Sequence, residues 1–142
     1  MVARNAGPAA KADAAAVARR LHEVTDRLRL AFEVTAAAHG LTSPQARLIL
    51  RLIEPTAMRE LSEHLACDKS NVTGIAARLS ERGLVVHAPG ADRRFKLLAL
   101  TDEGRSLRAA LQLAISETSP AMTRLTASER IALMALLGKL AP

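Results

Sequence analysis

A break of only three residues separates two helical stretches near the middle of the chain, and it constrains the fold more than any other feature. The first stretch follows Thr56, its expected cap, and the second runs from Lys69 to Arg82. Both repeat apolar residues at spacings of three and four, as amphipathic helices do. Only Ala66–Asp68 lies between them, and Asp68 is a favourable N-cap residue. So short a turn holds the second helix across the first, which predicts a helix-turn-helix.

The helical spacing of apolar residues ends after the second helix. Leu84–Ala88 is a short β-branched run, Pro89–Asp92 is turn material, and Phe95–Leu100 is predicted to be a second strand. The two strands would form a hairpin with Arg93-Arg94 at or near its tip. Helix, short turn, helix and hairpin together predict a mostly α fold with a two-stranded β wing, a winged helix-turn-helix.

Long helices flank this unit. We expect a flexible tail over 1–8, a dimerisation helix over 9–39, the winged helix-turn-helix over 41–100 and C-terminal dimerisation helices over 101–142. Apolar seams run along both flanking regions, and they are longer than one small winged core needs to cover. Pro120 should interrupt the C-terminal helices. The chain is therefore predicted to form a homodimer.

Local signals mark where several helices begin. Thr42 and Gln45 have the spacing of a capping box, as do Thr126 and Glu129. Thr101 is a further capping hydroxyl. The helix that follows Thr42 is expected to stop near Glu54-Pro55 because a proline disfavours helix at the residue before it.

The charge is concentrated on the winged unit. The chain carries a net charge of +6, and half of it falls between Cys67 and Lys96, in about a fifth of the length. Such a footprint indicates a polyanionic partner. The exposed start of the second helix holds small polar side chains suited to the major groove of DNA. The predicted contact residues on this helix are Lys69, Ser70, Asn71, Thr73, Gly74 and Arg78. Arg82, at its end, is expected to contact phosphate whatever the base sequence.

Other functions find little support in the sequence. One cysteine excludes an intrachain disulfide and a multi-cysteine zinc site, and no apolar run reaches the ~18 residues of a membrane span. No nucleophile–base arrangement or glycine-rich phosphate loop is visible, so we predict no enzyme activity, no cofactor and no metal site. No secretory signal is evident either, and a cytoplasmic protein is expected.

Three alternatives stay open. A winged domain can be a protein-interaction module without DNA binding, and it can bind RNA instead of duplex DNA. The third alternative is a redox-sensing regulator that acts through Cys67, because this cysteine lies just before the second helix. We favour a structural cysteine, because Asp68 would raise the thiol pKa and the position suits a small apolar side chain.

The ordered set of motifs resembles the multiple-antibiotic-resistance regulator (MarR) family over roughly residues 15–140. The motifs are Leu41-Thr42 to Gln45, Leu61-Ser62 to Leu65, Asp68 to Thr73, Leu79 to Val85, Asp92-Arg93-Arg94 and Leu100-Thr101 to Gly104. The resemblance implies a dimeric regulator, often a repressor, that binds a pseudo-palindromic operator. It also implies that Arg94 enters the minor groove while Asp92 orients it. Many members release DNA when a small molecule binds between the dimer helices and the winged domain, so an inducer of unknown identity is an implied partner.

Overall fold

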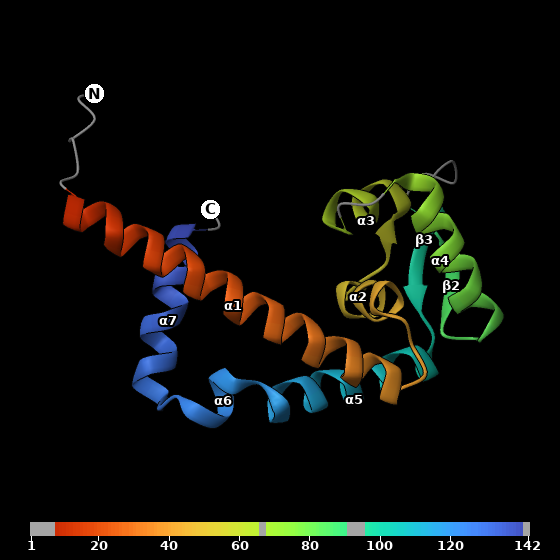
Figure 1. Ribbon diagram of the computed structural model, residues 1–142. Helices are drawn as coiled ribbons and strands as arrows, with labels where there is room; N and C mark the ends of the chain where they lie inside the picture. The colour runs from red at the N-terminus through yellow and green to blue at the C-terminus, as the bar shows by residue number, and fades with distance from the viewer. Residues whose placement is uncertain (1–7, 66–67, 91–95, 141–142) are drawn as a thin grey trace.

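The computed structural model describes residues 8–65, 68–90 and 96–140 of the chain (Figure 1). In chain order the elements are α1 (Pro8–Ala38), α2 (Ser43–Arg51), β1 (Thr56–Ala57), α3 (Met58–Leu65), α4 (Lys69–Glu81), β2 (Val85–Pro89), β3 (Lys96–Leu100), α5 (Asp102–Thr118), α6 (Pro120–Arg124) and α7 (Ala127–Leu140). The fold is mostly helical with a small antiparallel sheet, as the sequence predicts.

The hydrophobic core lies in the winged unit, where α2, α3, α4 and the sheet meet the start of α5. Its fully buried large side chains are Leu48, Ile49, Leu52, Leu61, Val72, Leu79, Leu98 and Leu111. α1 joins this core near its C-terminal end, through the buried Ala36 and the partly buried Phe32. α6 and α7 lie at the end of the molecule away from the sheet (Figure 1). Most of α1 and all of α7 therefore stand outside the core of a single chain.

The predicted capping box of α2 is confirmed. The Thr42 amide donates to Gln45 Oε1 at 2.9 Å, and the Gln45 amide donates to Thr42 Oγ1 at 3.4 Å. The helix ends earlier than the sequence suggests, at Arg51. The next residues turn toward β1, which leaves the Ile53 side chain 76% exposed. Ile53 is therefore not a core residue of this helix.

The sheet has one strand more than the sequence indicates. Its order is β1-β3-β2, with Thr56 opposite Leu98 and Val85 opposite Leu100. Thr56 thus belongs to a strand instead of capping α3, and its hydroxyl donates to the Glu54 carbonyl oxygen. A strand of two residues is too short to show an alternating pattern, and β1 is held in the sheet by its pairing with β3.

The C-terminal helices begin and break where the sequence predicts. Thr101 caps α5 by accepting from the Gly104 amide at 3.1 Å. α5 ends at Thr118, and Pro120 begins the short α6. The predicted capping box of α7 is also present, since the Thr126 amide donates to Glu129 Oε2 at 2.8 Å and the Glu129 amide donates to Thr126 Oγ1 at 3.3 Å.

Candidate nucleic-acid interface

α4 divides cleanly into a buried face and an exposed face. Its buried residues are Val72, Ile75, Ala76 and Leu79, at helical spacings of three, one and three. This pattern packs one side of the helix against the core and presents the other side to solvent. Four of the predicted contact residues near its start are exposed, and Arg78 is exposed one turn further along; the four are Ser70, Asn71, Thr73 and Gly74. Lys69 is the first residue of α4, but its side chain is not among those described.

The start of α4 differs from the prediction in one respect. Asp68 occupies the N-cap position in extended conformation, as expected, but its carboxylate makes no capping hydrogen bond. Its backbone carbonyl oxygen instead accepts from the amides of Asn71 and Val72, at 3.0 and 3.1 Å. The Asp68 side chain is exposed. The helix start is thus held by backbone geometry, without the side-chain cap.

Gly74 sits in the middle of α4 without a structural reason for being glycine. A Cβ atom built there would have no neighbouring atom within 4 Å, and the backbone does not have a positive φ. A glycine in a helix interior costs about 0.8–1.0 kcal/mol relative to alanine. Among the described residues, nothing would contact a methyl group at this position, so the backbone of α4 is open to solvent there.

The strands of the wing extend from α4 toward a connecting segment. β2 and β3 pair from Val85 opposite Leu100 to Pro89 opposite Lys96, so Pro89 belongs to a strand and not to the turn. The exposed Lys96 begins β3. The predicted contact residues of the wing, Asp92, Arg93 and Arg94, lie outside the described residues, and so does Cys67.

Arg82 has a role that the sequence does not reveal. It is the C-cap residue of α4, and its Nη1 donates to the Gly40 carbonyl oxygen at 2.8 Å. Gly40 closes α1 with a φ of +69°. A contact across 42 positions leaves no local signal, so the sequence places Arg82 only on an exposed helix end. The side chain expected to contact phosphate is engaged in a contact between helices.

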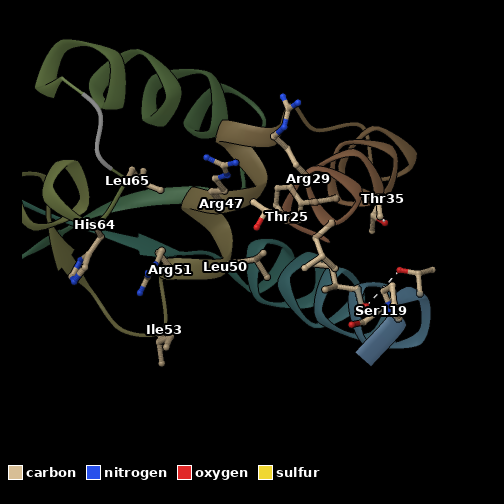
Figure 2. A pocket seen from close by; sticks show the side chains of 16 residues that line it. Thr25, Arg29, Thr35, Arg47, Leu50, Arg51, Ile53, His64, Leu65 and Ser119 are labelled. Carbon is tan, nitrogen blue, oxygen red and sulfur yellow. Dashed lines mark hydrogen bonds between the residues drawn. The ribbon is translucent and has the colours of Figure 1, made fainter. Parts of the chain in front are cut away.

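A cavity of about 750 Å³ lies beside the winged unit, between α1, α2, α3 and the α5–α6 junction. Its wall is mainly apolar, but Arg47 and Arg51 of α2 line it together with His64 of α3. Figure 2 shows these α2 side chains between those of α1 and α3. The Arg47 guanidinium carbon lies 5.9 Å from the centroid of the Phe32 ring. Sequence reasoning missed this cluster because three separate helices assemble it.

In the part of the chain that the structure describes, no helix is both long and apolar enough to cross a membrane. In the same residues, no three histidine, aspartate or glutamate side chains gather in a way that could hold a metal ion.

No protein-family model and no curated protein matches the sequence, but solved structures match it. The apo form of MarR from E. coli is 25% identical with a TM-score of 0.71, covering 88% of this chain and 96% of its own. CouR from Rhodococcus jostii RHA1, bound to p-coumaroyl-CoA, is 25% identical with a TM-score of 0.74, covering 88% and 91%. BpsR from Bordetella bronchiseptica, whose DNA binding is regulated by 6-hydroxynicotinic acid, is 27% identical with a TM-score of 0.69, covering 88% and 92%.

Proposed function

We propose that this chain, which has the winged helix-turn-helix fold of the MarR-family transcriptional regulators, binds duplex DNA as a homodimer and represses transcription until a ligand releases it. The observation that carries the proposal is the exposed face of α4. Ser70, Asn71 and Thr73 offer hydrogen-bond donors and acceptors there, and Gly74 leaves room beside them. This combination suits base edges in the major groove.

The dimer is supported by apolar side chains that a single chain leaves exposed. Along α1 the exposed fractions reach 70% at Val34, and along α7 they are 72% at Ile131 and 58% at Leu136. A row of exposed apolar side chains along a helix marks an interface, since soluble proteins rarely leave large apolar patches in contact with water. A second copy of the chain would cover both helices at once. It would also place two α4 helices on successive half-sites, about one helical turn of DNA apart.

The wing would add contacts to the minor groove and the DNA backbone. We carry over from the family resemblance that Arg94 enters the minor groove, that Asp92 orients it, and that Arg93 adds positive charge beside it. Lys69 and Arg78 would contact phosphate or a base from α4. These assignments rest on the positions of the residues in the motif.

The test is a selection of bound genomic fragments followed by anisotropy titrations at several salt concentrations. Arg94→Ala should weaken binding about tenfold or more, the ~1–3 kcal/mol of a specific contact, and Asn71→Ala should change the preferred bases. A wild-type protein without salt-dependent DNA affinity would instead favour the protein-interaction module. Tighter binding to duplex RNA than to duplex DNA would favour the RNA-binding alternative.

The ligand that we propose for the cavity is an organic anion with an apolar body. The cavity has the size of a small-molecule site. Arg47 and Arg51 line it, and among the described residues neither has a carboxylate partner within ion-pair distance. Unpaired arginines beside apolar walls favour a carboxylate or phosphate attached to a hydrocarbon group. The ligands named for CouR and BpsR both combine an acidic group with an aromatic ring.

Thermal unfolding tests this ligand class. Cinnamate should raise the Tm of the wild type and release DNA, whereas the neutral cinnamamide should do neither. At a hundredfold excess over Kd, binding adds about 2.7 kcal/mol of stability. Arg51→Leu should remove the response to cinnamate while keeping the apolar wall. If the acid and the amide shift the Tm alike, the arginines do not select charge and this part of the proposal is wrong.

A further inference from the structure

The two long helices that flank the winged unit, α1 and α5, both contact it at the same three residues. Arg82, Gly83 and Leu84 follow α4 directly, and we call them the junction. α1 approaches the junction by its C-terminal end, and α5 approaches it by its N-terminal end (Figure 1). Each hydrogen bond described below has a backbone carbonyl oxygen as its acceptor, so none of them joins two flexible side chains.

On the α1 side of the junction, Arg82 makes the polar contact. α1 has no basic residue in its last turn, although the partial negative charge at a helix C-terminus favours a cation there. Arg82 supplies that cation from the end of α4, because its Nη1 donates to the Gly40 carbonyl oxygen at 2.8 Å. Its Nη2 lies 3.5 Å from the position that a Cβ atom of residue 40 would occupy. The guanidinium therefore packs closely over the glycine that ends α1.

The α5 side of the junction is held more tightly. Thr101 Oγ1 donates to the Gly83 carbonyl oxygen at 2.6 Å, and the Thr101 amide donates to the Leu84 carbonyl oxygen at 3.1 Å. A Cβ atom on Gly104 would lie 2.0 Å from that same Leu84 oxygen, so only glycine allows this approach. The α5 contact is thus fixed by backbone packing. α1 packs against the core through Ala36 and Phe32, and the Arg82 contact adds a directed hydrogen bond from the end of α4 to the residue that closes α1.

We propose that Arg82 is a positioning residue that fixes the angle between α4 and the α1 arm, and thereby the half-site spacing that the dimer accepts. This inference rests on the proposed function. α4 has 13 residues, so its first turn lies about 20 Å from Arg82 at 1.5 Å per residue. A rotation of about 10° at the junction moves that end by about 3.5 Å, which is about one base-pair step of a duplex with ~34 Å per turn.

The experiment compares Arg82→Ala with Arg78→Ala, which removes the same side chain one turn earlier on the same helix. Each variant is titrated against operators whose half-site spacing is changed by one base pair in either direction, at four salt concentrations. For Arg82→Ala we expect the preference of the wild type for its best spacing to fall by about threefold or more, the scale of one lost hydrogen bond. The salt dependence should stay that of the wild type. Arg78→Ala should keep the spacing preference and lower the salt slope by about one.

The opposite pattern would overturn the inference. If Arg82→Ala lowers the salt slope as Arg78→Ala does and keeps the spacing preference, Arg82 is an ordinary phosphate contact. A measurement without DNA separates this inference from the proposed function. With spin labels at the exposed Ala77 of both subunits, in a Cys67→Ala background, the distance distribution between the two α4 helices should broaden in Arg82→Ala. An unchanged distribution refutes the positioning role even if the protein binds DNA, and a wild type that never binds DNA refutes the proposed function alone.

Discussion

Gly74→Ala separates the stability of α4 from its proposed contact with DNA, because the two effects have opposite signs. The added methyl group would meet no atom of the chain within 4 Å and needs no change of backbone conformation. The variant should therefore be more stable than the wild type by about 0.8–1.0 kcal/mol, the difference between glycine and alanine in a helix interior. Unfolding of 142 residues has an entropy of about 0.3 kcal/mol/K, so the Tm should rise by about 3 °C.

DNA binding should become weaker in the same variant. If a base edge or sugar lies against the backbone at Gly74, the methyl group forces α4 outward and lengthens the neighbouring contacts of Ser70 and Asn71. Loss of one good base contact corresponds to about 1–3 kcal/mol, so we expect a decrease in affinity of about tenfold. Differential scanning calorimetry and fluorescence anisotropy measure the two effects on the same preparation.

Ala77→Gly is the matched control, because it makes the reverse change at another exposed position of α4. It should lower the Tm by about 3 °C and leave operator affinity within about threefold, since it adds no bulk. The double variant, Gly74→Ala with Ala77→Gly, should recover the wild-type Tm and still bind weakly. Wild-type affinity in both Gly74→Ala and the double variant would refute the close approach of DNA at Gly74.

Three further predictions concern assembly, acid and oxidation. Leu136→Asp should give a monomer by light scattering and abolish high-affinity binding, because one exposed apolar residue of α7 becomes charged at the interface; a wild type that is monomeric at micromolar concentration would contradict the architecture. The backbone amide and the hydroxyl of Thr126 hold the pKa of Glu129 below its usual value, so its stabilisation of α7 is present at neutral pH and lost as the pH falls through the lowered pKa. Hydrogen exchange at the start of α7 should thus become faster in acid, and Glu129→Gln, which keeps an acceptor, should remove that pH dependence. Cys67→Ala should bind DNA within a few-fold of the wild type, and mild peroxide should leave wild-type binding unchanged; reversible loss of binding that Cys67→Ala does not show would establish a redox sensor instead.

The parts of the fold that could be predicted are those whose partners lie close in sequence. The capping boxes at Thr42 and Thr126 each join residues three positions apart, so their letters alone indicate the geometry. The break at Pro120 follows from the missing amide of a single residue. β1 could not be predicted, because Thr56 pairs with Leu98 and nothing within two residues of chain specifies a strand.

The same distinction applies to the candidate site. The exposed face of α4 follows from the spacing of Val72, Ile75 and Leu79, which assigns the remaining positions to solvent. The contact of Arg82 with Gly40 and the meeting of Arg47 with His64 in the cavity depend on how whole helices pack. The sequence therefore predicted the exposed face of α4, and it did not predict the contacts between helices that surround it.

The short strand β1 also has a consequence for the order in which the protein folds during synthesis. β1 follows α2 directly, but its pairing partners Leu97 and Leu98 leave the ribosome some forty residues later. Until then the segments of α2, α3 and α4 are available to form local structure, while β1 has no strand to pair with. The sheet can therefore form only after α2, α3 and α4 have been synthesised, which makes closure of the wing a late step in the folding of the winged unit.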